Sequence, residues 1–462
     1  MKTNISILGA CLLFILLSSI SARLNAQTAR SLYFIDNAPT RLNLNPALQP
    51  MRGYFNFPVI GAFGTSIVSD PLSVDDFIDI IDQKNDFLQN DELFNKLKNK
   101  NEINFDLTTD ILSFGFYAGK GFWTVNVGTK VMLSTSIPKS LFEFARNSDK
   151  LEEYIDHYQD LTQLPAELDY LLQGYQVKDL RINVDAFAEI GIGYSRPVNE
   201  KLTLGGRAKV LIGIANLNAH VNEMSITPNI NNLSWDVTTR GKMDVSMKGL
   251  ELTSDANENY INDMDIDSPG IGGFGAGIDL GATYKILKQL TVSAAVIDLG
   301  FINWSKSSTT YASVNESHSY KADEEGTDIF DYDLIQFQTT DETKGRTTAM
   351  RPTLNIGAEY TFFNNQLGIG VLSSTRFQKP ETFSELTISA NYHPRNWFAA
   401  TLSYSILHSD FKTLGLGLKL GPVFLASDYI PTGDLKSIKR ANAYLGISIP
   451  MGKKKSAVEY NY

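Results

Sequence analysis

Apolar and polar residues alternate strictly over long stretches of this chain. From Phe274 to Ile286, seven apolar residues occupy the even positions, and the odd positions carry glycines and a threonine together with Asp279 and Lys285. Successive side chains of a strand point to opposite faces, so this segment predicts a strand with one apolar and one wet face. The alternation recurs from Ile182 to Tyr194 and from Leu354 to Phe362. Repeated segments of this kind are typical of a transmembrane β-barrel, whose strands need about 9–11 residues to span.

Further strands can be placed by the same alternation, and we predict an all-β fold, a transmembrane antiparallel barrel of about fourteen strands. Val237 to Leu252 is interpreted as a hairpin that contributes to this number. Short polar connections between aromatic or aliphatic residues, such as those from Tyr194 to Leu202 and from Tyr392 to Trp397, predict one rim with an aromatic girdle. The other predicted strands are Ile111 to Ala118, Phe122 to Val131, Leu202 to Ile214, Leu290 to Leu299, Leu367 to Arg376, Leu386 to Tyr392, Trp397 to Leu407, Leu414 to Leu420, Val423 to Ile430 and Ala441 to Met451.

The remaining segments are long and polar, and two of them show helical signals. Ser73 followed by Asp76 resembles a capping box before an apolar stripe, and Leu141 to Leu172 has similar spacing. Asp255 to Asp267 and Asp323 to Glu342 are acidic and weakly apolar, which predicts exposed loops.

The N-terminus predicts export. Lys2, an apolar run from Ile5 to Ile20 and the stretch ending at Ala26 form a secretory signal peptide, with cleavage expected after Ala26. Leu8 to Cys11 also resembles a lipoprotein processing box, but a cut before Cys11 would leave most of the apolar run on the mature chain. Cleavage after Ala26 removes the only cysteine and two of the 41 basic residues, so 39 basic residues remain against 51 acidic ones, a net charge of −12. This acidic balance argues against a nucleic-acid partner.

Motifs that suggest chemistry have simpler explanations here. Gly270 to Gly275 matches the dinucleotide fingerprint, but these glycines open a strand, whereas that fingerprint opens a helix. Asp263, Asp265 and Asp267 alternate like the start of a calcium loop, but Ser268 stands where that loop needs glycine. The five histidines lack zinc spacing and no Gly-x-Ser-x-Gly elbow occurs. We therefore expect no catalytic residue, no metal, no cofactor and no enzyme activity.

Charged residues of both signs fall on the wet side of the predicted strands. They could form a mutually paired network that fills a small interior, or a lumen that positions a ligand or a plug. The mixed signs argue against a simple one-sign ion filter. These lumen-facing candidates are Asp185, Glu189, Arg207, Lys209, Asp279, Lys285, Glu359, Glu385 and Lys419.

Two motifs carry a family resemblance. Asn45, Pro46 and Ala47, before the first strand, resemble the Asn-Pro-Ala element in the N-terminal hatch of the FadL/TodX long-chain fatty acid transporters, and the order of signal peptide, hatch and barrel is similar to that superfamily. The chain most resembles a branch found in Bacteroidota that is related to the PorV and PorQ barrels of type IX secretion. Tyr444 to Met451 resembles the closing-strand signal read by the barrel-assembly machinery.

The resemblance implies four segments: a signal peptide at 1–26, a hatch at 27–52, a barrel with long loops at 53–451 and a polar tail at 452–462. It also implies an outer-membrane protein, inserted into lipid by the barrel-assembly machinery, that takes up a small hydrophobic molecule. Asn45, Pro46 and Ala47 would belong to the hatch or gate, and Phe55, Phe57, Ile60 and Phe63 could line an apolar groove. The alternative is a PorV-like scaffold that holds secreted or surface proteins through its long loops.

Overall fold

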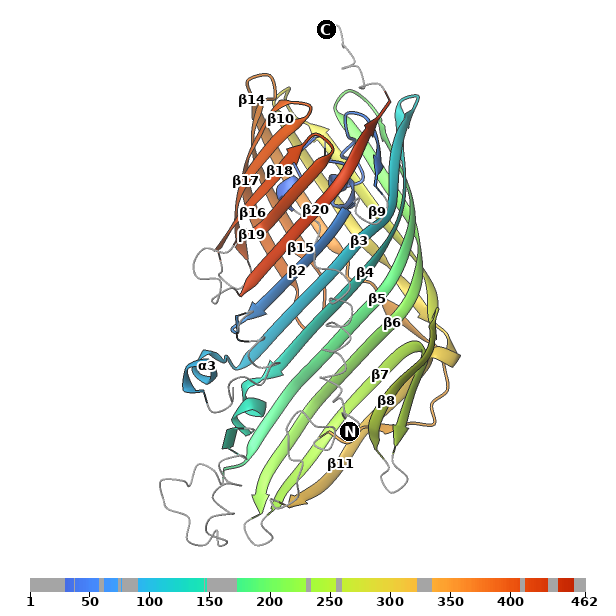
Figure 1. Ribbon diagram of the computed structural model, residues 1–462, viewed down its shortest axis with the longest axis vertical. Coiled ribbons are helices and arrows are strands. Elements are labelled where there is room, and N and C mark those ends of the chain that lie inside the picture. The colour runs from blue at the N-terminus through green and yellow to red at the C-terminus, as the bar shows by residue number, and fades with distance from the viewer. Residues whose placement is uncertain are drawn as a thin grey trace.

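The strands of this computed structural model form one closed antiparallel barrel of fourteen wall positions, which confirms the predicted all-β class (Figure 1). The structure describes residues 30–36, 38–57, 62–73, 76, 90–144, 146–147, 173–229, 234–254, 260–321, 335–407, 412–430 and 439–452. The predicted signal peptide and most of the C-terminal tail lie outside these residues.

The wall strands are β1 (Gly53–Asn56) and β2 (Ala62–Asp70), which share one position, then β3 (Lys100–Ala118), β4 (Gly121–Pro138), β5 (Tyr175–Pro197), β6 (Leu202–Asn229), β9 (Gly273–Lys285), β10 (Leu290–Trp304), β14 (Thr353–Phe362), β15 (Leu367–Arg376), β16 (Phe383–Arg395), β17 (Phe398–Leu407), β18 (Lys412–Leu420), β19 (Val423–Ile430) and β20 (Arg440–Met451).

The outer surface of the barrel is apolar and the inner surface is polar, as the alternation predicts. In β9, Phe274 is 59% exposed on the outside, whereas Asp279 is 1% exposed on the inside. The apolar exterior suits lipid, and the closed hydrogen-bond ladder leaves no free strand edge in the wall.

In β5 the lipid-facing pattern holds only from Ala188 to Tyr194. Ile182 and Ala186, which we predicted to face lipid, are buried. Ile182 belongs to an apolar cluster on strands that continue past the barrel, so its surroundings are protein rather than lipid.

Part of the same sheet continues beyond the barrel, and we call this part the extension. β6 pairs with β9 up to Gly213 and with β7 (Ser234–Ser254) from Ala215 onward, so the sheet divides at β6. β7 also pairs with β8 (Ile261–Gly270) and β11 (Thr309–Lys321). Val237 to Leu252 is thus part of one strand outside the barrel and not a hairpin of its wall. Smaller elements are β12 (Gln338–Thr339), β13 (Arg346–Ala349), η1 (Arg30–Leu32), η2 (Pro39–Asn43), η5 (Lys306–Ser308) and α3 (Asp91–Lys96).

Two predictions for the insertions need comment. Ile261–Gly270, which we predicted as part of an acidic loop, is strand β8, because the alternation of Asp263, Asp265 and Asp267 is the strand period itself. Ser73 and Asp76 exchange backbone-to-side-chain hydrogen bonds, as in a capping box, while most of the two predicted helical stretches lies outside the described residues. Among the residues that the structure describes, no helix is long and apolar enough to cross a membrane.

Short turns gather at one end of the barrel, where the described chain also ends (Figure 1). The extension formed by β5, β6, β7 and β11 leaves the opposite end. At the first end β1 begins, with Gly53 paired to Met451. Trp397 and Phe363 are exposed in its turns, in agreement with the predicted rim of aromatic residues.

The pairing register of the wall changes between β1 and β2. Asn56 pairs with Ser448 of β20 and Phe63 pairs with Leu445, so seven residues on one strand correspond to three on its neighbour. Ala62 resumes pairing with β3 at Asp110. Residues 58–61, which join the two strands, lie outside the described chain.

Candidate functional site

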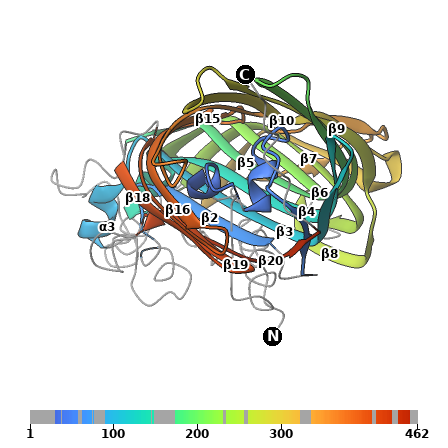
Figure 2. The same cartoon turned by 90° about the horizontal axis from the view of Figure 1, so that it is seen from above.

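Residues 30–50 lie inside the ring of strands, where Figure 2 shows the blue N-terminal turns enclosed by the wall. We call these residues the luminal segment. Nearly all of its described side chains are buried, including Leu32, Tyr33 and Asn45. The segment joins the wall covalently only through β1, so its position depends on side-chain contacts with the lumen.

The N-terminal end of the luminal segment is held by an ionic anchor. The Asp428 carboxylate accepts hydrogen bonds from the backbone N–H groups of Arg30 (2.9 Å) and Ser31 (2.8 Å). The Arg30 Nη1 lies 3.0 Å from Glu385 Oε2, which also accepts a hydrogen bond from the Tyr429 hydroxyl. Asn442 fixes this arrangement, because its Oδ1 accepts the Asp428 N–H. Every member of the anchor is buried, which makes a change to one partner costly.

The aromatic residues just after the anchor pack against glycines of the wall strands, which have no side chain at the contact. A Cβ on Gly370 would lie 2.5 Å from the Phe34 ring, and one on Gly357 would lie 3.0 Å from the Tyr33 ring. The Tyr33 hydroxyl shares a hydrogen bond with Ser293. The small residues on the lumen face therefore make room for the aromatic residues of the segment.

Asn45, Pro46 and Ala47 lie beside Tyr33 against neighbouring strands, and the Asn45 side-chain amide donates a hydrogen bond to the Tyr33 hydroxyl at 3.2 Å. A Cβ on Gly281 would lie 2.1 Å from Asn45 Oδ1, and one on Gly205 would lie 2.4 Å from the Pro46 carbonyl oxygen. Asn45 also caps its own turn, since its Oδ1 accepts the Ala47 N–H at 2.9 Å. The tripeptide thus lies against the wall and is fixed by close backbone approach.

Further hydrogen bonds tie the C-terminal half of the segment to the wall. Arg207 donates to the Leu42 carbonyl and to Asn43 Oδ1, and Asn355 donates to the Leu44 carbonyl. Near the rim, the Gln49 amide donates to the Ser195 carbonyl. The luminal segment is bound by wall strands along its whole described length.

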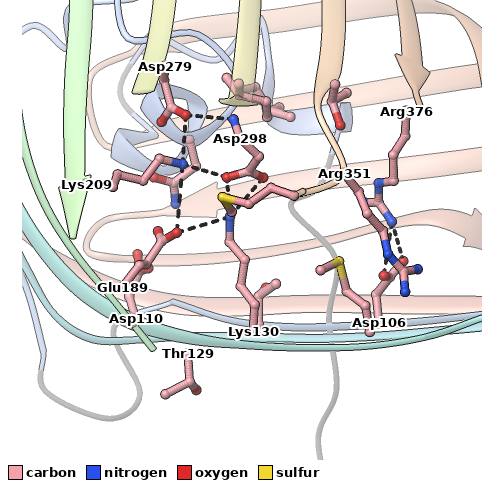
Figure 3. Close-up of a pocket in the computed structure, with 18 of the residues that line it drawn as sticks. Asp106, Asp110, Thr129, Lys130, Glu189, Lys209, Asp279, Asp298, Arg351 and Arg376 are labelled. Atoms are coloured by element: carbon pink, nitrogen blue, oxygen red, sulfur yellow. Dashed lines mark hydrogen bonds and ion pairs between the residues drawn. The ribbon is translucent and has the colours of Figure 1, made fainter. Parts of the chain in front are cut away.

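A network of buried charges crosses the lumen next to the segment (Figure 3). Lys209 Nζ lies 2.7 Å from Asp279 Oδ1 and 2.5 Å from Asp298 Oδ1. Lys130 Nζ lies 2.9 Å from the same Asp298 oxygen and 3.3 Å from Glu189 Oε2. Two ammonium groups and three carboxylates from β4, β5, β6, β9 and β10 therefore form one cluster.

Asp298 reaches this cluster only because β10 contains a bulge. Strict alternation would place Asp298 with the lipid-facing Ala294 and Val296, but the pairing with β9 shifts between Val296 and Leu299, and Asp298 has a φ of 59°. A bulge redirects side chains, and Asp tolerates the left-handed conformation better than most residues. After the bulge Leu299 faces outward.

Two further ion pairs lie near the cluster and border a cavity of about 80 Å³ in the middle of the lumen, which we call the waist cavity. Arg376 Nη1 contacts the Asp106 carboxylate at 2.8 Å. Arg351 contacts Asp185 and donates to Ser134 Oγ at 2.7 Å. The labelled charges of Figure 3 surround this cavity from several strands.

The residues singled out in the sequence are distributed over several heights of the lumen. Four of them meet in the charged network: Glu189, Arg207, Lys209 and Asp279. Asp185 lies beside it, and Glu385 belongs to the anchor of the luminal segment. Glu359 accepts a hydrogen bond from Asn391, Lys419 donates to the Gly421 carbonyl, and Lys285 is exposed at the end of β9.

Several members of the site were missed from the sequence. Lys130 follows the same alternation as Asn126 and could have been found by it, whereas Asp106 and Asp110 fell outside the predicted strand, which began too late. Phe55 and Phe57 need a correction: Tyr54 and Asn56 are the buried residues of β1, and Phe57 is exposed, so this stretch does not line an internal groove. Ile60 lies outside the described residues.

The geometry defines a membrane-spanning β-barrel whose lumen is occupied by its own N-terminal segment. The model of a family of unknown function, DUF5723, matches residues 46–428, and the chain belongs to that family. No curated protein matches the sequence.

Solved structures of outer-membrane proteins are similar in fold at low identity. The Ralstonia pickettii toluene transporter TbuX is 10% identical, with a TM-score of 0.39 and coverage of 93% of this chain and 95% of that one. The P. putida toluene transporter TodX is also 10% identical, with a TM-score of 0.39 and coverage of 90% and 94%. The translocator domain of the autotransporter NalP from Neisseria meningitidis is 5% identical, with a TM-score of 0.36 and coverage of 98% and 100%.

Proposed function

We propose that this protein is a gated transport channel of the outer membrane and that its luminal segment is the hatch. The observation that carries the proposal is the way residues 30–50 occupy the lumen. They contact glycines on the wall and are held by hydrogen bonds and one ionic anchor, all of which are non-covalent. A segment bound in this way can be displaced without breaking the barrel, and displacement would connect the two ends of the lumen.

The proposed cargo is a small hydrophobic molecule, a prediction from the family resemblance. Met132, Phe187, Ile297 and Met350 give the waist cavity some apolar lining. A role as a PorV-like scaffold has no specific support in the described contacts.

Hatch displacement can be tested in planar bilayers with the double variant Asn45→Ala plus Pro46→Ala. We expect higher conductance than for the native chain, because the capped turn against Gly205 and Gly281 is lost. The matched control is Asn315→Ala plus Pro269→Ala, on exposed positions of the extension. Equal conductance of all three proteins would contradict a gating role for the luminal segment.

A further inference from the structure

We propose that the waist cavity is a cation site, in which Asp110 and Glu189 recognise a small ammonium group and make the pathway cation-selective. This inference rests on the proposed transport function for its selectivity part, whereas binding can be tested without transport. The charge balance of the cavity suggests a cation site. Both signs of charge line the cavity, so the balance depends on which charged groups lack a partner of opposite charge.

Every basic side chain that lines the cavity already has an acidic partner within 4 Å. Six bases are matched by six carboxylates in this way. The bases are Arg30, Lys130, Arg207, Lys209, Arg351 and Arg376, and the carboxylates are Asp106, Asp185, Glu189, Asp279, Asp298 and Glu385. An incoming anion therefore finds no basic group without a counter-charge among the described lining residues.

Asp110 is the seventh carboxylate and has no ion pair among the described residues. It lies on β3 at a bulge, opposite Gly128 on one side and Ala62 on the other. Neither neighbour has a polar side chain, and the Asn43 side chain of the luminal segment supplies a neutral hydrogen bond. A carboxylate held in this way at a cavity keeps acceptor positions for a cationic ligand.

Glu189 gives a second indication on the same wall, because Asp110 on β3 and Glu189 on β5 are both register partners of Gly128 on β4. Its side chain lines the cavity and the residue is only 5% exposed, yet its Oε2 has no hydrogen-bond partner. The two lysines near this oxygen, Lys130 at 3.3 Å and Lys209 at 3.8 Å, make closer contacts to Asp298. A buried acceptor without a hydrogen bond is costly, and an ammonium group in the cavity would provide the missing donor.

The size and the remaining lining fit a small ligand of this class. The cavity of about 80 Å³ holds a few non-hydrogen atoms. Thr108 shares the lumen-facing side of β3 with Asp106 and Asp110 and adds a hydroxyl group to its border, and a hydroxyl oxygen can accept a further hydrogen bond from an ammonium group. Ethylammonium matches these properties, because it has one charged group and a short apolar tail that can contact Met132, Ile297 and Met350.

The first test measures reversal potentials in planar bilayers under a potassium chloride gradient. We expect potassium to be favoured over chloride and Asp110→Asn to lower that permeability ratio at least threefold, because it removes the carboxylate without an ion pair at nearly unchanged volume. Asp265→Asn, on the exposed strand β8, makes the same change outside the lumen and should leave the ratio unaltered. Chloride preference, or an equal ratio in the native chain and Asp110→Asn, would overturn the inference.

The second test measures ethylammonium binding to the detergent-purified protein by titration calorimetry. We expect binding that weakens at least tenfold in Asp110→Asn and is unchanged in Asp265→Asn, with folding of each variant checked by heat-dependent migration in gel electrophoresis. If no variant conducts but ethylammonium binds as expected, the transport proposal fails and the cation site stands. Absence of binding, or equal binding in Asp110→Asn, would show that water alone satisfies the cavity.

Discussion

Gly205 and Gly281 are register partners on β6 and β9, and Asn45 and Pro46 fill the space in front of both. The absence of two side chains on neighbouring strands thus sets how closely the luminal segment approaches the wall. Because a Cβ on Gly205 would lie 2.4 Å from the Pro46 backbone, the segment and not a flexible side chain would have to move.

We therefore expect Gly205→Ala to increase conductance in planar bilayers. Gly206→Ala is the matched control, since the nearest atom to its Cβ would be 3.6 Å away, an ordinary contact. A native level of conductance in Gly205→Ala would show that the segment can shift without opening the lumen.

The anchor around Arg30 predicts a change in accessibility. Arg30→Ala leaves the buried Glu385 without its cation, a loss of about 3–5 kcal/mol for pairs of this kind. A cysteine introduced at the buried Ser31 should then react faster with a membrane-impermeant maleimide. Arg52→Ala, at a partly exposed position near the rim, should not change that rate, and equal rates in both variants would exclude an anchoring role for Arg30.

The bulge at Asp298 predicts coupling between distant strands. Asp298→Asn weakens contacts of both Lys130 and Lys209, and we expect the unfolding temperature of the barrel to fall. Adding Lys130→Met removes one uncompensated charge, so the double variant should be more stable than the sum of the two single effects. Strict additivity would indicate that the charges do not act as one network.

The wall strand β9 and the extension strand β8 are expected to respond differently to a new charge on an exposed position. Ile278→Lys places an ammonium group on the lipid-facing side of β9 and should destabilise the barrel by about 2–4 kcal/mol if the site is near the bilayer midplane. Ile266→Lys makes the same change at an equally exposed residue of β8, outside the wall, and should have little effect. Unfolding in urea from lipid vesicles measures both, and similar losses would contradict the assignment of β8 to the extension.

The sequence is sufficient for the class of fold because strand alternation is a local property. β9 follows the predicted alternation of outward and inward side chains throughout. β10 departs from this alternation at Asp298, because a bulge there turns the side chain inward, and no single residue of the sequence predicts the bulge. The expected number of strands was right for partly wrong reasons, since β7 was counted in the wall and the wall position shared by β1 and β2 was not.

The site was less predictable because its contacts join positions far apart in the chain. Asn45, Pro46 and Ala47 could be selected by resemblance, but their partners Gly205 and Gly281 lie more than 150 residues away. Gly281 falls on the wet face of the strand predicted from Phe274 to Ile286, whereas no prediction concerned Gly205. That they leave space for the luminal segment can be seen only in the folded barrel.

The anchor of Arg30 also has a consequence for the order of events during assembly. Its partners Glu385, Asp428 and Asn442 belong to β16, β19 and β20, which are among the last parts of the chain to be synthesised. The first described residues of the chain therefore acquire their binding site only when the final strands are in place. Fixation of the N-terminal end of the luminal segment and completion of the wall therefore coincide.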